Sequence, residues 1–342
     1  MNGNQSANTT MALDYRTAGV DIEAGEALVD TIKPFVKATR TAGVLSEIGL
    51  FGGFFDARFP GYDHPVLVAS TDGVGTKLKV AIMADKHDTV GQCLVNHCVN
   101  DILACGARPQ FFLDYFATGR LAPHVAADVI KGMTVACKEN ECALLGGETA
   151  EMPSMYADGE YDVAGTIIGV VDKPKIVNGE HIKAGDVLIG LPSTGLHTNG
   201  YSLARAALFP TYRIDQHLDE LGTTVGDALL AVHRSYLHPI VPLVDAGLVN
   251  GLSHVTGGGL VGNTSRVLRD GLALDVAWKT WDVPAIFHLI QAAGNVSDDE
   301  MRHVFNLGVG MVVIVSPDKV DDVMRRLADS SPFIVGSVVA KG

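Results

Sequence analysis

Three acidic residues occur at the ends of apolar segments or within them. Asp72 follows the apolar run 66–69 in the sequence S-T-D-G-V-G-T-K. Asp101 interrupts an apolar stretch in V-N-D-I-L, and Glu148 follows the glycine pair of L-L-G-G-E. Mg²⁺ takes few carboxylates in nucleotide sites and leaves its other positions to phosphate and water. The sequence therefore predicts a site for Mg²⁺ and ATP, with Asp72, Asp101 and Glu148 as metal ligands. A structural hydrogen bond between Asp101 and His97, one helical turn earlier, is the alternative for that acid.

A glycine-rich turn follows Asp72 directly. It contains Gly73, Gly75, Thr76 and Lys77. Glycine reaches positive φ and lets a ligand approach backbone N–H groups, while lysine offers a cation to phosphate. The spacing is not that of a P-loop, which has four residues between its first glycine and Gly-Lys-Ser/Thr. We predict that Asp72 and these four residues bind the nucleotide phosphates; an ordinary tight connection is the alternative.

Two polar loops in the second half are candidates for binding an anionic substrate. L-P-S-T-G-L-H-T-N-G-Y-S precedes a predicted helix, whose free N–H groups would attract anions. The second loop is T-G-G-G-L-V-G-N, a weak match to the dinucleotide pattern because it comes late in the chain. The predicted substrate ligands are Thr194, Gly195, Asn199, Thr256, Gly257, Gly258 and Gly259. We predict that His197 faces a cleft and transfers a proton or stabilises charge. A simple turn at Asn199, or a loop histidine bonded to backbone, is the alternative.

Helical and extended patterns alternate along the chain. In the first half we expect helices at 25–39, 90–105 and 123–139, and strands at 66–69, 110–116, 143–145 and 163–171. In the second half we expect strands at 187–191, 311–315 and 333–339. Helices are expected there at 201–208, 225–232, 260–268 and 283–292, with another opened by Ser316-Pro317. A composition shift at 172–175 indicates a domain boundary, and periodicity leaves the strand order open.

Composition narrows the class of protein. A chain of 342 residues with 47% hydrophobic residues and 38 glycines is typical of a packed, turn-rich α/β protein of about two domains. The net charge of −13 argues against a nucleic-acid surface, and no apolar run is long enough to span a membrane. Residues 1–13 are expected to form a loose, disordered tail without a signal peptide. Five cysteines without a C-x-x-C pair favour free thiols in the cytoplasm.

Several motifs occur together in one order and carry a resemblance to a known family. They are D-Y-R-T-A-G-V-D-I-E-A-G, D-G-V-G-T-K, V-N-D-I-L, G-A-R-P-Q-F-F-L-D-Y, G-G-E-T-A-E-M-P, Y-D-V-A-G, H-T-N-G-Y-S, T-G-G-G and F-N-L-G-V-G-M. The sequence resembles the phosphoribosylformylglycinamidine cyclo-ligases, the aminoimidazole ribonucleotide synthetases of purine biosynthesis. D-G-V-G-T-K and G-G-E-T alone indicate only the wider ATP-using superfamily, which includes selenophosphate synthetase and thiamine-monophosphate kinase. G-V-D-I-E-A-G followed by I-K-P-F-V-K-A-T-R narrows the resemblance to the cyclo-ligases.

The resemblance implies an α/β (α+β) fold of two domains. Residues 14–171 would form the ATP-binding domain, whose mixed sheet pairs across a homodimer, and residues 172–342 an α+β sandwich. The implied reaction is ATP-dependent ring closure of formylglycinamidine ribonucleotide, a phosphorylated small molecule, to aminoimidazole ribonucleotide. ATP phosphorylates the formyl amide oxygen and the amidine nitrogen then attacks. Lys33 matches a family lysine that helps cover the nucleotide. Without the resemblance, the sequence around Lys33 favours a position on a solvated helix face.

Three other functions stay open. Another ATP-using synthetase or kinase of the superfamily is the nearest, although selenophosphate synthetase would need a reactive cysteine or selenocysteine before Cys93, the first cysteine here. A non-catalytic ATP-binding protein is the second, and retention of all three acids argues against it. A dehydrogenase using the Gly257 loop is the third.

Overall fold

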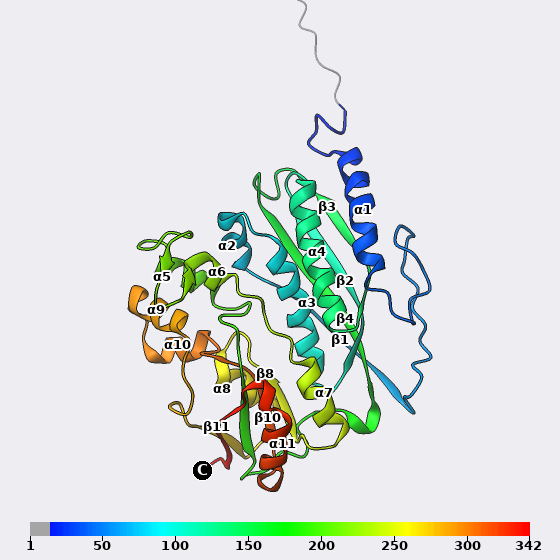
Figure 1. The fold of residues 1–342 in the computed structure, drawn as a ribbon. Helices are drawn as coiled ribbons and strands as arrows, with labels where there is room; N and C mark the ends of the chain where they lie inside the picture. The colour runs from blue at the N-terminus through cyan, green and yellow to red at the C-terminus, as the bar shows by residue number, and fades with distance from the viewer. Residues whose placement is uncertain (1–13) are drawn as a thin grey trace, which may run out of the picture.

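The computed structural model describes residues 14–342 and contains two main sheets (Figure 1). The tail expected at 1–13 lies outside the described residues. The first sheet has the order β1-β4-β2-β3 and the second the order β8-β10-β5-β11-β9. The last strand of the first sheet ends at Asp172, the first residue of the predicted boundary at 172–175, and all strands of the second sheet begin after that boundary.

The first sheet is mixed, as expected. It consists of β1 (Pro65–Gly73), β4 (Tyr161–Asp172), β2 (Arg108–Thr118) and β3 (Ala143–Glu151). Strands β2 and β3 run parallel, and the other pairs are antiparallel. All four strands are longer than expected, and two extend furthest past their expected ends: β1 continues four residues past Ala69 and β3 six residues past Leu145. Asp72, Gly73 and Glu148 are consequently strand residues, where the sequence predicted turns.

Two long helices cover one face of this sheet (Figure 1). They are α3 (Asp88–Leu103) and α4 (Pro123–Glu139), and α1 (Ile22–Lys37) packs beside α4. Helix α3 buries the apolar positions that the helical spacing predicted: Val90, Leu94, Cys98 and Ile102. The two helices approach closely at glycines. A Cβ added to Gly91 would lie 2.0 Å from the carbonyl oxygen of Val129, and one added to Gly132 would lie 2.0 Å from that of Asp88.

The opposite face of the first sheet carries exposed apolar side chains. Leu67 is 61% exposed, Tyr115 40% and Leu113 36%. Because side chains alternate along a strand, Leu113 and Tyr115 point away from the helix side, to which the buried Phe112 and Phe116 belong. We call Leu67, Leu113 and Tyr115 the uncovered face.

The second sheet is antiparallel throughout. Its strands are β8 (Gly251–His254), β10 (Val309–Val315), β5 (Val187–Pro192), β11 (Phe333–Ala340) and β9 (Leu272–Val276). The helices of this half are α5 (Tyr201–Leu208), α6 (Val225–Leu229), α7 (Leu237–Asp245), α8 (Gly259–Thr264), α9 (Ala285–Gly294), α10 (Asp298–Val304) and α11 (Val320–Arg326). A two-stranded ribbon of β6 (His217–Leu218) and β7 (Thr223–Thr224) precedes α6. Every residue of β10 is buried.

The two halves share a hydrophobic core, and the second half has a further, separate cluster of buried side chains. The shared core joins α3 and α4 with residues of β5, α7 and β10. Helix α2 (Lys77–Ala84), which follows β1, also lies between the halves. Because β1, α3 and the loops of the second half meet here, the ends of these elements form a junction, and the candidate site lies in it.

Candidate active site

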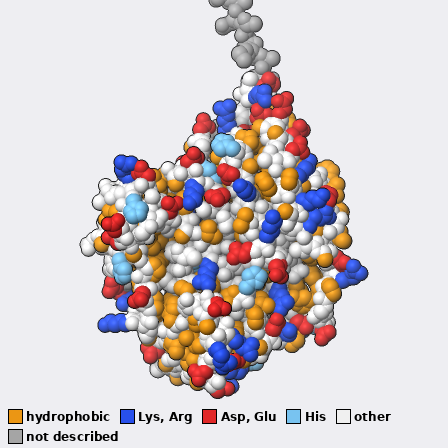
Figure 2. Space-filling model, in the orientation of Figure 1, with side chains coloured by type: hydrophobic (Ala, Val, Ile, Leu, Met, Phe, Trp, Pro, Cys, Tyr) orange, Lys and Arg blue, Asp and Glu red, His pale blue; other side chains and the backbone are white. Residues whose placement is uncertain are grey.

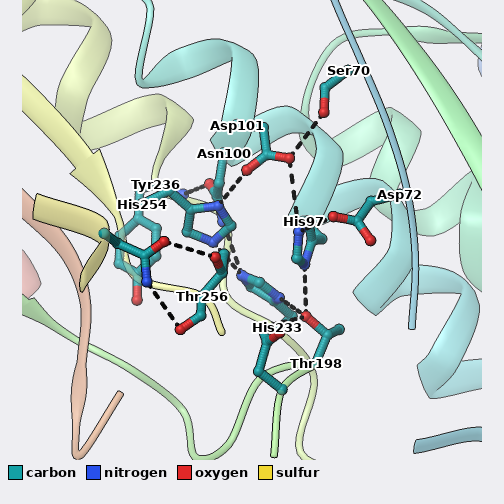
Figure 3. A network of polar contacts seen from close by, with 12 residues as sticks. Ser70, Asp72, His97, Asn100, Asp101, Thr198, His233, Tyr236, His254 and Thr256 are labelled. Atoms are coloured by element: carbon teal, nitrogen blue, oxygen red, sulfur yellow. Dashed lines mark hydrogen bonds and ion pairs between the residues drawn. The ribbon is translucent and has the colours of Figure 1, made fainter. Parts of the chain in front are cut away.

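Side chains from both halves meet in a network of polar contacts at the junction (Figure 3). Asp72 comes from β1, and His97 and Asp101 come from α3. His97 Nε2 donates to Asp72 Oδ2 at 2.8 Å and lies 3.7 Å from Asp101 Oδ2. From the second half, Thr198 Oγ1 lies 2.6 Å from His97 Nδ1, and His254 Nδ1 donates to Asp101 Oδ1 at 2.8 Å. Two candidate acids, Asp72 and Asp101, therefore contact the same histidine.

Helix α3 presents its polar residues on one side because they are three and four positions apart. Asn100 is fully buried, yet each of its polar atoms has a partner. Its Nδ2 donates to the carbonyl oxygen of Arg234 at 2.8 Å, and its Oδ1 accepts from the N–H of Tyr236 at 3.0 Å. Burial of a polar residue is costly without such partners. Backbone groups of the second half thus satisfy the hydrogen-bonding capacity of Asn100, the polar residue buried in α3.

The predicted bond between His97 and Asp101 takes a different form. At 3.7 Å the two residues form an ion pair and not a hydrogen bond, and His97 bonds Asp72 instead. Asp101 satisfies its oxygens with His254 and with Ser70, whose Oγ donates to Oδ2 at 2.9 Å. The sequence predicted that His97 and Asp101 are neighbours, but not that His97 forms its hydrogen bond with Asp72 of β1.

The charges of the network are fixed by burial and by these contacts. Burial lowers the pKa of His97, but the hydrogen bond to Asp72 and the charges of both carboxylates outweigh it, so the pKa lies above its ordinary value. Burial raises the pKa values of Asp72 and Asp101, and their bonds to His97 and His254 reverse that effect. Both carboxylates therefore stay ionised around a histidine that favours its protonated form.

His197 is not in an open cleft, and that expectation is wrong. Its side chain is 1% exposed, and its ring stacks on His233 with ring centroids 3.9 Å apart. Its Nε2 accepts from the N–H of Thr194 at 3.2 Å, while its Nδ1 is buried without a partner. Burial lowers the pKa of His197 and of His233 well below the usual range, so both rings are neutral.

Lys77 does not face the predicted phosphate turn. Its ammonium group is fully buried and donates to the carbonyl oxygens of His197 at 2.9 Å and Ala231 at 2.7 Å. A third contact reaches Cys93 Sγ at 3.1 Å. Lys77 therefore fastens α2 to the second half, and the prediction that it contacts phosphate is wrong for this arrangement.

The other residues of the turn stay close to Asp72. The N–H of Gly73 donates to Asp72 Oδ1 at 2.7 Å, and Gly75 adopts a φ of 55°. Thr76 Oγ1 lies 2.9 Å from Ser202 Oγ, at the start of α5. The turn thus lies against the second half and begins at the exposed side of Asp72.

Glu148 is separated from the other two acids by the sheet. Asp72 pairs with Gly165, Gly165 with Asp114 and Asp114 with Gly147, so these four residues form one row across the sheet. Glu148 is one position further along β3, pairs with Tyr115 and is exposed. Since neighbouring residues of a strand point to opposite faces, Glu148 points to the uncovered face. The structure brings Asp72 and Asp101 together and leaves Glu148 apart.

Asp114 is an acid of this row that the sequence reading missed as a site candidate. It lies on the helix side of β2, between two glycine positions, and the Oδ1 atom fills the space where a Cβ of Gly147 would be. Burial raises the pKa of Asp114 to about 7, and the charge of Glu148 adds to this effect. The sequence signal that could have identified Asp114 is an acidic residue inside the apolar strand F-F-L-D-Y.

The two loops predicted to bind substrate lie against each other. A Cβ on Gly257 would lie 3.2 Å from Asn199 Oδ1. Thr256 Oγ1 donates to Asn263 Oδ1 at 3.1 Å, and Gly258 and Gly259 have positive φ at the start of α8. Thr194 donates its hydroxyl to the carbonyl oxygen of Val232, and the carbonyl oxygen of Gly195 accepts from Ser193 and Asn306. Hydrogen bonds within the protein therefore hold both loops in position.

Lys33 lies on α1, outside the junction. Its ammonium group pairs with Asp30 at 2.7 Å and is half-exposed. Together with Lys37 and Arg40 it lines a cavity of about 460 Å³ between α1 and the start of β3. Within the described chain, this geometry agrees with a solvated helix face and leaves the family role of Lys33 a prediction.

The residues that sequence reasoning missed are mainly histidines. His233 follows α6, and His254 ends β8; their Nε2 atoms are 3.0 Å apart. Nothing in the sequence places them near α3, because the contact arises only when the two halves pack. Across residues 14–342 all cysteines are free, and no helix is long and apolar enough to cross a membrane.

Comparisons with known proteins cover nearly the whole chain. Residues 57–171 match the family described as "AIR synthase related protein, N-terminal domain", and residues 183–342 match its C-terminal domain. A phosphoribosylformylglycinamidine cyclo-ligase of Burkholderia pseudomallei is 52% identical over 342 residues, covering 99% of this chain and 97% of that protein. Crystal structures of thiamine-monophosphate kinase from Stenotrophomonas maltophilia and of hydrogenase maturation protein HypE in complex with ATP share the fold. The kinase structure has a TM-score of 0.69 and 15% identity, and the match covers 91% of this chain and 94% of the kinase chain. The HypE structure has a TM-score of 0.63 and 18% identity, and the match covers 93% of this chain and 87% of the HypE chain.

Proposed function

Because this chain belongs to the AIR synthase related family, and its full-length relatives are phosphoribosylformylglycinamidine cyclo-ligases, it is a ligase that closes the ring of a purine precursor, and we propose how its residues do so. ATP is the phosphoryl donor, consistent with ATP complexes among proteins of this fold. The γ-phosphoryl group is transferred to the formyl amide oxygen of formylglycinamidine ribonucleotide, which releases ADP. The amidine nitrogen attacks the same carbon, the carbon–oxygen bond breaks, and phosphate and a proton leave.

Phosphoryl transfer requires mainly positioning and charge neutralisation from a protein. Asp72 is the best-placed group for this role, because its side chain is 45% exposed and ends next to the Gly73–Thr76 turn. Asp101 lies deeper, with 26% of its side chain exposed. We propose that the turn residues Gly73, Gly75 and Thr76 contact the phosphates through backbone and hydroxyl groups.

The donor chemistry of the two carboxylates fits Mg²⁺, which prefers hard oxygen ligands. When bound to Asp72 and Asp101, Mg²⁺ would neutralise phosphate charge. Glu148 stays the predicted third acid, although it points to the uncovered face of the sheet. His97, positively charged between the two carboxylates, holds both in place.

The ribonucleotide would bind between the two adjacent loops of the second half. Asn199 and Thr256 offer polar side chains, and the glycines Gly257–Gly259 allow close approach to backbone N–H groups. Thr194 and Gly195 stay predicted substrate contacts, and Lys33 a predicted cover for the nucleotide. We assign His197 a positioning role, since its buried ring orders the loop that carries Asn199.

We propose that the working molecule is a cytoplasmic homodimer with domains 14–171 and 172–342. The uncovered face of the first sheet supports the dimer, because its apolar side chains would be buried by a second copy. Neither nucleic acid nor a membrane is a proposed partner. Figure 2 supports the first exclusion, since basic and acidic side chains are interspersed on the face that it shows.

The observation that carries the site assignment is the convergence of Asp72 and Asp101 on His97 at the junction. Its test is ATP hydrolysis with and without formylglycinamidine ribonucleotide, in the parent and in Asp101→Asn. Asparagine keeps the shape and still accepts from Ser70 but removes the charge. We expect kcat to fall by about tenfold to a thousandfold, since lost charge stabilisation costs a few kcal/mol.

The matched control is Asp227→Asn, which removes an acid paired with Lys86 on the surface, at a half-exposed position. This control should keep the parent kcat. A near-parental kcat for Asp101→Asn at ordinary Mg²⁺ concentration would exclude Asp101 from the site.

A further inference from the structure

We propose that the junction also binds a borderline transition-metal ion such as Zn²⁺, with His97, Asp101 and His254 as ligands and Asp72 as a fourth donor. The three ligand atoms of the first set lie within 4.8 Å of one another. The inference stands independently of the proposed reaction, because it concerns binding of the metal alone.

The spacing of the donor atoms suits a tetrahedral ion. Ligands bound to zinc at about 2.0–2.1 Å in a tetrahedron are about 3.3 Å from one another. Here His254 Nδ1 and Asp101 Oδ1 are 2.8 Å apart, and His97 Nε2 and Asp101 Oδ2 are 3.7 Å apart. His97 Nε2 and Asp72 Oδ2 are 2.8 Å apart. The two contacts of Asp101 use different oxygens, so its carboxylate would turn to offer one oxygen to both histidines, and shifts of about half an ångström would bring the separations to the tetrahedral value.

The ring orientations distinguish this set from a second group of nearby histidines. A metal lies close to the plane of each imidazole that binds it, because it bonds the in-plane lone pair of nitrogen. The rings of His97 and His254 are inclined at 74°, so both planes can contain one ion. His197 and His233 also lie near His254, but their rings are stacked 3.9 Å apart at only 18°. Nearly parallel stacked planes cannot share an ion between them, which argues against that trio.

Hydrogen bonds to neighbouring residues fix the orientation of the proposed ligands, as they do in known metal sites. A metal-binding histidine ordinarily uses its other nitrogen for a hydrogen bond that fixes the ring. His97 Nδ1 lies 2.6 Å from Thr198 Oγ1, and His254 Nε2 lies 3.0 Å from His233 Nε2. Ser70 donates to Asp101 in the same way. The ion would replace the protons that His97 Nε2 and His254 Nδ1 donate to the carboxylates, and these protons would be released to solvent; the two carboxylates then compensate the charge of the divalent ion.

The donor set selects the kind of metal. Imidazole nitrogens suit zinc and its neighbours in the first transition row, whereas Mg²⁺ favours carboxylate, carbonyl and water oxygens. Two of the four proposed donors are nitrogens. Asp72 and Asp101 would serve both metals, so an ion held by the histidines would compete with Mg²⁺ for these oxygens.

The test uses the full chain after treatment with a chelator, without ATP or substrate. Co²⁺ serves as the probe because its visible absorption reports tetrahedral nitrogen and oxygen ligands. We expect about one Co²⁺ per chain, displaced by Zn²⁺ and retained in a large excess of Mg²⁺. His97→Gln and His254→Asn, which keep an amide near the bonding nitrogen, should each weaken Co²⁺ binding by about a hundredfold or more.

His181→Gln is the control, since this histidine is 74% exposed and outside the junction. It should bind Co²⁺ like the parent, and circular dichroism should show that all variants are folded. X-ray absorption of the zinc-loaded parent supplies a measurement that needs no variant, with two imidazoles per zinc expected. Absence of stoichiometric Co²⁺ binding, three imidazoles per zinc, parental affinity in His97→Gln, or loss of binding in His197→Gln alone would overturn the proposal.

Discussion

At the scale of single residues, buried polar groups decide how the junction is built. Asn100 and His97 interrupt a buried helix, and each finds its partners on another element. A hydrogen bond of this kind contributes only about 1 kcal/mol net, but an unpaired buried group costs more. These residues therefore specify which loops must lie against α3 more than they add to stability. The same reasoning applies to His197 and Asp114, whose surroundings lead to distinct predictions.

His197 should act by holding its loop in position. We expect His197→Ala to lower both the melting temperature and kcat, because it removes a ring that packs on His233 and an acceptor for the N–H of Thr194. His197→Gln can still accept that bond but cannot carry a proton at neutral pH. Recovery of most of the lost rate in His197→Gln would support positioning. If the glutamine variant stays as slow as the alanine variant while melting like the parent, proton transfer by His197 is the better account.

Asp114 should make the stability of the protein depend on pH. Its pKa is about 7 in the folded chain, against an ordinary value of 3.8, because burial disfavours the charged form. The folded state therefore holds a proton that the unfolded state has released, so stability decreases as the pH rises from about 4 to about 7. Asp114→Asn lacks this titration. Urea unfolding across that range should show the parent losing stability relative to the variant, and parallel profiles would contradict the prediction.

At the scale of elements, apolar periodicity predicted most helices and failed where polar residues continue a strand. Helices α4 and α5 have the predicted bounds, Pro123–Glu139 and Tyr201–Leu208. The sequence reading ended β1 at Ala69 because Ser70–Gly73 look like a turn, yet ladder pairing with β4 extends the strand over them. Three helices were not predicted, namely α2, α7, which contains Pro242, and α10. The sequence predicted Asp72 and Asp101 as candidate site residues, and the structure places both at the junction, whereas the position of His254 depends on packing between the halves.

Helix α2 shows how one lysine can join two halves of a chain. In Lys77→Met the carbonyl oxygens of His197 and Ala231 would lose their buried donor. Each unpaired buried group costs about 1–3 kcal/mol, so the free energy of unfolding should fall by several kcal/mol. Lys79→Met on the same helix removes a half-exposed ion pair with Glu160, worth about 0–1 kcal/mol. Equal destabilisation of the two variants in denaturant unfolding would refute this assignment.

Glycines set the distance between α3 and α4. In Gly91→Ala the new methyl group would overlap the carbonyl oxygen of Val129, a backbone atom that cannot move without shifting α4. Overpacking of this kind costs about 1–3 kcal/mol or more, and we expect a clear fall in the melting temperature. Gly25→Ala in α1 meets no atom within 4 Å and should raise stability by about 0.5–1 kcal/mol. A neutral Gly91→Ala would mean that the two helices pack less closely than described.

At the scale of the whole molecule, the two halves are joined by a shared core and by charged groups at their junction. Residues of β1 and α3 form half of the polar network, and loops of the second half form the rest. The site therefore exists only when the halves pack together. A rearrangement that separates them would break the pairs of His97 with Thr198 and of Asp101 with His254 at once. Among the described residues, Leu67, Leu113 and Tyr115 stay exposed on the face of the first sheet opposite α3 and α4.

This uncovered face should bind a second copy of the chain. Leu67, Leu113 and Tyr115 expose apolar area on neighbouring strands, and symmetric dimers are the commonest way in which soluble proteins bury such a surface. Light scattering at micromolar concentration should give the mass of two chains. Leu67→Lys would place a charge in the interface and should shift the mass toward one chain. Val135→Lys, at a comparably exposed position on α4, should stay dimeric. A parent that has the mass of one chain while fully active would show that the face stays open to solvent and that each active site is complete within a single chain.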